Sequence, residues 1–317
     1  MDEIERNKIM KSNIKKFLCI IIATAMLCSL GISAFSHNDP VMETSAAVYM
    51  SAEDKIAFAK EKDAIYAAQA QPQNISANPV TRHTEVRELI KQAVFAPESE
   101  KEGIREELAC YGIYEFEGQI IDSPDGQTRS SSGDVNVHAP TIFYDSSAQT
   151  WTVSCSGGWR TNNWDTPIFP ALFGNVGGED GFGIGFTSLA GTYTSYVMDS
   201  YAEIHNGEIG GDYKSETTRS RSDGDGSKGF GFRLQDSVVP NSVGLGSYVG
   251  KFWYGYCTYS QNFQNYSGVA TGYYAHTWSQ TIINSVSFGY QGAVAGVQVG
   301  FSNNEKSFVA YGTDKRF

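Results

Sequence analysis

The C-terminal 184 residues alternate between apolar and small or polar side chains, and this period of two limits the fold more than any other feature. The run Ile283–Tyr290 shows the pattern clearly. Val286 and Phe288 fall on one side of an extended chain, and Ser285 and Ser287 fall on the other. Burial of the apolar side stabilises such strands by about 25 cal/mol per Å² removed from water. The pattern therefore predicts half-buried β-strands rather than helices.

Composition supports this reading of the same stretch, which holds 32 aromatic residues and 27 glycines. Turn pairs such as Asn206-Gly207 and Asp223-Gly224 separate the runs at roughly the 8–12-residue spacing of all-β sandwiches and barrels. We predict a mainly β fold, an antiparallel β-sandwich that is jelly-roll-like or similar. The expected strands are Val135–Tyr144, Gln149–Cys155, Gly181–Ser188, Thr192–Ile204, Tyr213–Ser220, Gly229–Gln235, Tyr248–Tyr259, Gly268–Trp278, Ile283–Tyr290, Val294–Phe301 and Ser307–Tyr311.

The N-terminus carries the pattern of an export signal. Basic residues from Lys8 to Lys16 precede the apolar run Phe17–Leu30, and mostly small residues follow it up to Ser36. This order is typical of a secretory signal peptide, so we predict cleavage before His37 and a secreted, extracellular protein of bacterial origin. The alternative is an uncleaved membrane anchor, but the run is shorter than the roughly 20 residues that span a bilayer.

Helical signals come before the β-rich stretch. Ser51 begins a pattern like a capping box, Thr84–Phe95 has apolar residues on one side of a helix, and Ser99 begins a third helix. A polar linker with a basic residue at Arg129 makes this region a candidate propeptide, and a permanent accessory domain is the alternative. The predicted organisation is a signal peptide (1–36), a tether (37–50), a small helical region (51–117), a linker (118–133) and a β-sandwich domain (134–317).

The formal net charge is −11 at pH 7, from 24 Lys and Arg against 35 Asp and Glu. Cleavage of residues 1–36 removes five basic and three acidic groups and changes the charge to −13. Proteins that bind nucleic acid need a basic face, so the sequence argues against a nucleic-acid partner.

Three cysteines remain after the predicted cleavage: Cys110, Cys155 and Cys257. Secreted proteins meet conditions that permit disulfides. Since Cys155 and Cys257 both lie in the β-rich region, they are the expected pair. The alternative is that all three thiols are free, because buried cysteine packs well as a small apolar residue.

Motifs that carry enzyme chemistry are missing from the sequence. It contains no GxSxG, HExxH or CxxC, and the loop Asp223–Gly226 lacks the later acidic ligand of a calcium loop. We therefore predict no catalytic residue, no metal and no cofactor. Asp199, Glu203 and His205 would share one strand face and form the best acid/base candidates, with a solvated polar surface as the alternative.

Aromatic residues are the stronger functional signal, because they fall on both faces of the predicted strands and exceed the need of one core. Tyr and Trp combine an apolar body with a polar group and suit sugars or protein partners. We predict a ligand-binding surface, with the filling of the core as the alternative. Its expected residues are Trp253, Tyr254, Tyr273, His276 and Trp278.

These observations favour a secreted, non-enzymatic binding or interaction protein whose partner is a surface glycan or protein of unknown identity. One alternative is a pore-forming toxin or antimicrobial protein, the only reading that involves a membrane. Its basis is the alternation in Ile283–Tyr290 and Val294–Phe301. A further alternative is a secreted hydrolase that uses Asp199 and Glu203.

Overall fold

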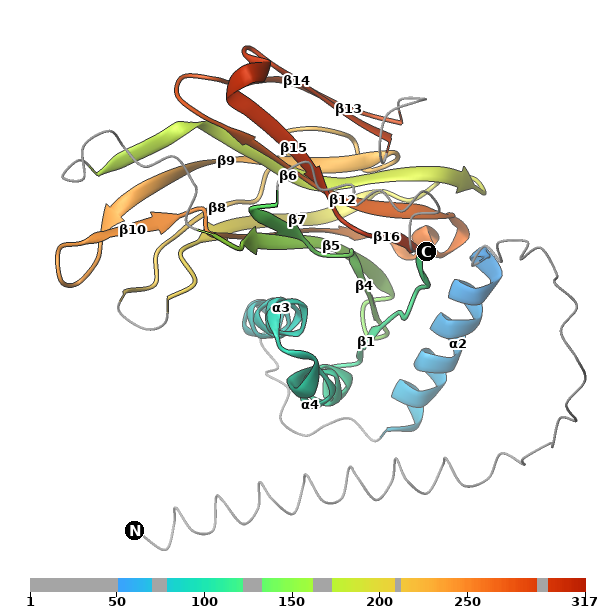
Figure 1. Ribbon diagram of the computed structural model, residues 1–317. Coiled ribbons are helices and arrows are strands. Elements are labelled where there is room, and N and C mark those ends of the chain that lie inside the picture. The colour runs from blue at the N-terminus through green and yellow to red at the C-terminus, as the bar shows by residue number, and fades with distance from the viewer. Residues whose placement is uncertain (1–50, 70–78, 122–132, 162–172, 209–211, 290–295) are drawn as a thin grey trace, which may run out of the picture. The chain divides into compact units, whose positions relative to one another are not determined.

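The computed structural model describes residues 51–69, 79–121, 133–161, 173–208, 212–289 and 296–317. The chain is mainly β, with antiparallel sheets that curl into a half-barrel (Figure 1), so the coarse fold class is confirmed. The predicted signal peptide, the tether and most of the linker, with Arg129, lie outside the described residues. No helix in these ranges combines the length and apolar character needed to cross a membrane.

The described residues contain three α-helices, close to the predicted positions, and two short 3-10 helices, Gln261–Asn265 and Asn304–Lys306. The α-helices are α2 (Ala52–Ala68), α3 (Pro79–Phe95) and α4 (Glu98–Cys110). Ser51 caps α2 in a capping box, because its backbone N–H donates to the Asp54 carboxylate and its side chain accepts from the Asp54 backbone N–H. Helix α3 begins at Pro79 rather than at the predicted Thr84. Proline is well tolerated in a first helical turn because the N–H it lacks would have no helical partner there.

The first sheet has seven strands in the order β1-β4-β5-β11-β7-β8, and β3 also pairs with β5. Strand β11 pairs with β5 from Trp151 opposite Tyr259 to Gly158 opposite Phe252, and it pairs with β7 on its other side. The bounds are β1 (Ile113–Glu115), β3 (Val135–Val137), β4 (Thr141–Asp145), β5 (Thr150–Trp159), β7 (Val197–His205), β8 (Ser215–Thr218) and β11 (Phe252–Tyr259).

The second sheet also has seven strands, in the order β10-β9-β6-β12-β16-β2, with β15 paired to β12. Strand β6 lies near the middle and pairs with both β9 and β12. The bounds are β2 (Ile120–Ile121), β6 (Gly174–Ala190), β9 (Gly229–Pro240), β10 (Gly246–Val249), β12 (Ser267–Thr277), β15 (Ser307–Tyr311) and β16 (Asp314–Arg316).

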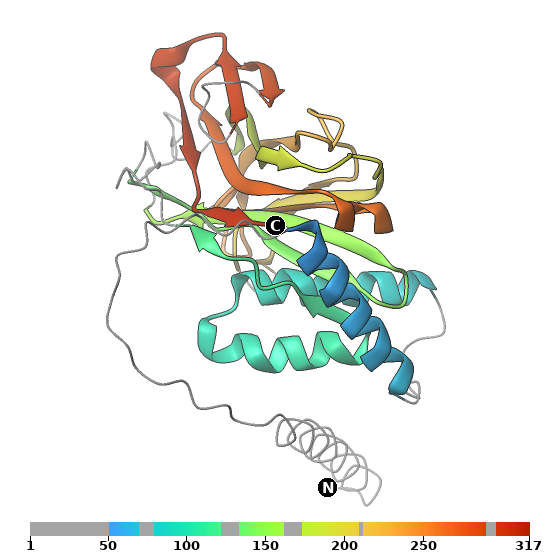
Figure 2. The same cartoon turned by 90° about the vertical axis from the view of Figure 1, so that its right-hand side faces the viewer.

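A hairpin of β13 (Ile283–Phe288) and β14 (Val297–Phe301) forms a two-stranded sheet of its own. Its apolar side packs on Tyr273 of β12 and Tyr311 of β15. The hairpin and the helices α3 and α4 lie on opposite sides of the two large sheets (Figures 1 and 2).

Two predicted strands are each divided in the structure. Val135–Tyr144 becomes β3 and β4 because Pro140 has no N–H for a sheet ladder. Tyr248–Tyr259 becomes β10 and β11, and the break lies at Gly250, whose φ of +148° favours glycine.

The aromatic residues of the described chain fill three buried clusters, one of them the cluster beneath the β13–β14 hairpin. The main core takes buried side chains from both large sheets, among them Trp151, Phe182 and Trp253. The second core lies between helices α3 and α4 and the outer face of the first sheet, where Leu89 and Ile90 pack with residues such as Tyr254. The helices and strands therefore contribute to shared cores, and residues Tyr49–Phe317 cluster as one compact unit.

Candidate functional site

On three neighbouring strands of the second sheet, the series of buried inward-facing side chains ends with an ionisable residue. On β6, the inward side chains of Ile184 and Phe182 are followed by that of Asp180 at the same spacing of two. Asp236 on β9 and His276 on β12 lie beside Asp180, and all three side chains are at most 1% exposed. We call these three residues the acid–imidazole cluster, because their candidate ligand atoms lie within 4.8 Å of one another.

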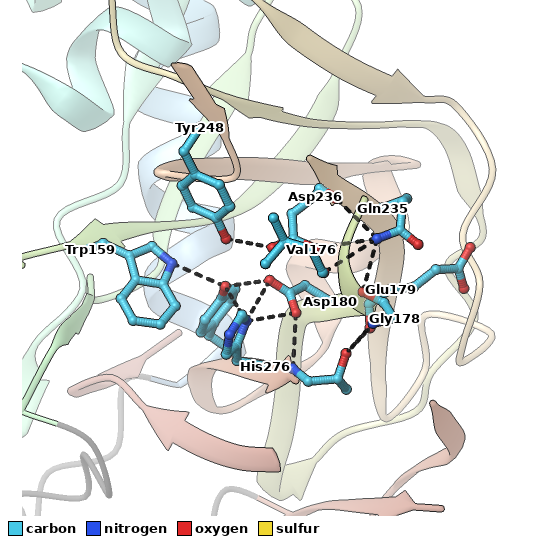
Figure 3. A network of polar contacts seen from close by, with 11 residues as sticks. Trp159, Val176, Gly178, Glu179, Asp180, Gln235, Asp236, Tyr248 and His276 are labelled. Atoms are coloured by element: carbon cyan, nitrogen blue, oxygen red, sulfur yellow. Dashed lines mark hydrogen bonds and ion pairs between the residues drawn. The ribbon is translucent and has the colours of Figure 1, made fainter. Parts of the chain in front are cut away.

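Asp180 is surrounded by hydrogen-bond donors (Figure 3). Its two carboxylate oxygens lie 2.9 and 3.0 Å from Nδ1 of His276. The Tyr274 hydroxyl donates to Oδ2 at 2.6 Å, and the Thr277 backbone N–H donates to Oδ1 at 3.1 Å. Trp159 in turn donates its indole N–H to the Tyr274 hydroxyl at 3.2 Å. Side chains from both sheets thus fix the position of this carboxylate.

Asp236 is held by a second set of contacts. The Tyr248 hydroxyl donates to its Oδ2 at 2.6 Å, and the Gln235 amide donates to its backbone carbonyl at 3.0 Å. The same amide donates to the Gly178 carbonyl at 3.2 Å, which connects β9 to the start of β6. Burial raises the pKa of Tyr248 and of Tyr274 well above the ordinary value, so both phenols remain protonated donors.

The other ring nitrogen of His276 has an apolar environment. Nε2 is buried and has no hydrogen-bond partner among the described residues. The ring centroids of Trp159, Trp278 and Phe308 lie 4.9, 5.0 and 5.6 Å from that of His276. Only Nδ1 therefore faces carboxylates.

The sequence analysis did not identify Asp180 and Asp236 as site residues, although the signal was present. In GFGIGF (181–186), every second residue is apolar, and Asp180 continues this series in the N-terminal direction. In GFGFRLQD (229–236), the apolar residues alternate in the same way, and Asp236 continues their series in the C-terminal direction. An ionisable residue that continues a buried alternation needs a partner in the interior, because a buried charge is costly when unpaired. Two such runs on adjacent strands would have pointed to this cluster.

A second set of polar contacts joins helix α3 to strand β7. The His83 ring lies 3.3 Å from the Asp199 carboxylate, and Lys91 donates to Glu203 at 2.9 Å. Between these pairs, the Arg87 guanidinium lies 4.5 Å from the centre of a tyrosine ring on β7. Four residues advance a helix by about 6 Å and two residues advance a strand by almost 7 Å, so the side chains meet in sequence. We call this the α3–β7 interface; its pairs are His83 with Asp199, Arg87 with Tyr201, Lys91 with Glu203 and Phe95 with His205.

The predicted acid/base candidates Asp199, Glu203 and His205 do share one strand face, but α3 covers it. Burial alone would raise the pKa of Glu203, yet hydrogen bonds from Tyr213 and Lys91 outweigh burial and hold the pKa below its ordinary value. Burial also lowers the pKa of His205 to about 4. A carboxylate held ionised is a poor general acid, so this geometry gives the hydrolase alternative no support.

Four of the five predicted ligand-binding residues lie in the interior. Trp253 stacks on Tyr274 in the main core with ring centroids 3.9 Å apart, and Tyr254 lies beneath helix α3. Tyr273 lies beneath the β13–β14 hairpin, and His276 belongs to the acid–imidazole cluster. Trp278 alone among the five is partly exposed. In the described residues, these aromatic side chains contribute to three buried clusters rather than to one core and an open surface.

Cys155 and Cys257 are free thiols in the structure. Cys155 on β5 and Cys257 on β11 are buried on adjacent strands, but Cys155 lies opposite Gly255, so the two cysteines are offset by two positions. The predicted disulfide is not formed in this structure. Cys110 is exposed at the end of α4.

Comparisons with known proteins give no family. No family model matches the chain, and no curated protein matches it. A solved structure described as "AvmM Catalyzes Macrocyclization in Alchivemycin A Biosynthesis" aligns with 58% of this chain and 94% of its own, at 6% identity and a TM-score of 0.20. A likeness at that score supports no conclusion about fold or function.

Proposed function

We propose that the chain is a secreted, non-enzymatic binding protein built on a β-sandwich, and that its ligand face is the surface of the first sheet beneath α3. The sandwich is supported by the main core, to which both large sheets contribute. The observation that carries the ligand face is its chemistry. Tyrosines lie beside carboxylates there, and aromatic rings with nearby hydrogen-bonding groups are suited to a surface glycan or a protein loop.

In this proposal the helical region is a removable cover. Helix α3 contacts the face through charged pairs and a modest apolar stripe, and Lys91 takes the place of a cationic or hydrogen-bonding ligand group at Glu203. The linker after the helices offers Arg129 as a cleavage point in the sequence. Mass spectrometry of the culture supernatant tests both steps. A chain that begins near His37 supports export, one that begins near Ser130 also supports removal of the cover, and a chain found only inside the cell contradicts the proposal.

The binding test uses the full-length chain and two matched variants. Ala93→Glu places a charge in the buried contact between α3 and the sheet, whereas Gln92→Glu adds the same charge at the exposed neighbouring position. We expect Ala93→Glu to open α3, seen as faster hydrogen exchange over residues 79–95, and to increase retention on purified cell-wall glycans or surface proteins. Gln92→Glu should behave as the unmodified chain.

Tyr254→Ala in the Ala93→Glu background should abolish that retention, because it removes one of the tyrosine rings that form the proposed face. If hydrogen exchange shows α3 open and the chain still binds no glycan or surface protein, the proposal is wrong.

The toxin alternative receives less support. It depends on the β13–β14 hairpin, whose strands have six and five residues. A strand that crosses a bilayer needs about 9–11 residues. Dye release from liposomes at high protein concentration would revive this alternative.

A further inference from the structure

We propose that the acid–imidazole cluster is a binding site for one divalent transition-metal ion such as Zn²⁺, with Asp180, Asp236 and His276 as the ligands. The proposal is independent of the function suggested above, because the cluster lies in the second sheet, away from the α3–β7 interface. Three side chains of metal-binding type converge there from three adjacent strands, and each is almost fully buried.

The geometry suits a small ion. Zinc binds imidazole nitrogen and carboxylate oxygen at about 2.0–2.2 Å in tetrahedral sites, which places ligand atoms roughly 3.3 Å apart. Nδ1 of His276 already lies 2.9 and 3.0 Å from the two oxygens of Asp180. The candidate ligand atoms of the whole cluster lie within 4.8 Å of one another, so one ion can contact all three side chains after small side-chain adjustments.

The charge of the three side chains and their nitrogen and oxygen donor atoms indicate which class of metal ion the site would bind. Metal ligation requires ionised carboxylates and a neutral imidazole, and such a ligand set would carry a charge of −2 that a divalent cation neutralises. Ca²⁺ takes six to eight oxygen ligands and Mg²⁺ keeps several waters, and three buried side chains that include an imidazole meet neither requirement. Mixed nitrogen and oxygen donors of low number are typical of zinc and its neighbours.

Coordination by His276 would use Nδ1, the ring nitrogen that faces Asp180, and not the unpartnered Nε2. Coordination through Nδ1 leaves the imidazole proton on Nε2. That atom has no hydrogen-bond acceptor among the described residues, but the rings of Trp159 and Trp278 pack around it. An N–H group can donate weakly to an aromatic face, so this tautomer is accommodated.

The surrounding tyrosines complete the site. Tyr274 donates to Asp180 and Tyr248 donates to Asp236, so each carboxylate is oriented by a phenol. Hydrogen bonds of this kind fix metal ligands in position, and their loss typically weakens metal binding by about 10–100-fold. Tyr274→Phe keeps the ring that stacks on Trp253 and removes only the hydroxyl.

The test uses the full-length chain, stripped with a chelator and then titrated with Zn²⁺ and Co²⁺. We expect about one equivalent bound, a rise in Tm with Zn²⁺, and Co²⁺ absorption bands of a site with nitrogen and oxygen ligands. Asp180→Asn and His276→Gln should abolish uptake, and Tyr274→Phe should weaken it by about 10–100-fold while the far-UV spectrum is unchanged.

Two control variants remove other candidate ligands. Glu203→Gln changes a buried carboxylate on the first sheet, and Cys110→Ser changes the exposed thiol; neither should alter binding. The proposal is overturned if the stripped chain takes up neither metal. It is also overturned if Asp180→Asn, His276→Gln and Tyr274→Phe all bind as tightly as the unmodified chain, or if Cys110→Ser abolishes the uptake.

Discussion

Helix α2 buries a lysine whose amine has no hydrogen-bond partner among the described residues. The Lys55 side chain is fully buried, and its Nζ lies 5.0 and 5.9 Å from the ring centres of Phe317 and Phe263. Burial lowers the pKa of this amine from 10.5 to about 7, and the nearby Asp54 charge opposes the change only in part. The site therefore disfavours the charged form that lysine has in water.

The replacement Lys55→Met should stabilise the protein. A fall in pKa from 10.5 to about 7 corresponds to roughly 5 kcal/mol, at about 1.4 kcal/mol for each tenfold change. Because the folded-state pKa is the lower one, this cost is fully present below pH 7 and disappears as the pH rises to 10.5. Methionine has similar length and helix propensity, and its sulfur packs well on aromatic rings.

The assay is urea unfolding of both proteins between pH 6 and pH 10. We expect Lys55→Met to raise the free energy of unfolding by about 2–5 kcal/mol at pH 6, with the lower figure allowing for water that reaches the amine. The gain should shrink steadily above pH 7. Lys60→Met changes an exposed lysine of the same helix and should have little effect at any pH. A loss of stability in Lys55→Met, or a gain that does not vary with pH, would refute the reasoning.

Three further predictions concern other buried groups. Gly157→Ala should cost about 3 kcal/mol in urea unfolding, because the added Cβ would lie 2.2 Å from a buried indole on β11. Gly103→Ala has open space on a helix and should gain about 1 kcal/mol; equal effects at the two glycines would contradict this account. The imidazole of His205 should stay neutral in NMR spectra down to about pH 5, since its pKa is about 4. Stability should fall with pH between 6.5 and 4, and titration near pH 6.5 would show that α3 does not cover the ring. Iodoacetamide should label Cys110 but not Cys155 before unfolding, because burial raises the pKa of the Cys155 thiol to about 12. Mass spectrometry that finds Cys155 labelled at a similar rate would contradict its burial.

The sequence predicts the strands well because an alternating pattern directly reports a half-buried strand. The helices were equally visible through their caps and prolines. The three short strands β1, β2 and β16 were missed, because two or three residues are too few to show a period. Sheet order also could not be predicted, since it depends on contacts between residues far apart in the chain.

The sites were harder to predict. Aromatic residues on both faces of β11 suggested an open binding surface, but a local pattern cannot show that helices formed more than a hundred residues earlier cover one face. The same limit applies to Glu203, whose partner Lys91 lies 112 residues away. The acid–imidazole cluster could have been predicted in part, because Asp180 and Asp236 each continue an apolar alternation.

Along the α3–β7 interface, the helix and the strand advance by slightly different distances from one pair to the next. Each helical step of four residues falls short of each strand step of two residues by somewhat under 1 Å, so a mismatch of about 2 Å accumulates over the pairs from His83 to Phe95. The pair of Phe95 with His205 is the last one, because α3 ends at Phe95 and β7 ends at His205. If α3 slid by one turn, Arg87 would reach Glu203, but Asp199 would lose its contact with His83 and Lys91 would face the neutral His205. The alternation of carboxylates and aromatic rings along β7 therefore favours a single docked position of helix α3.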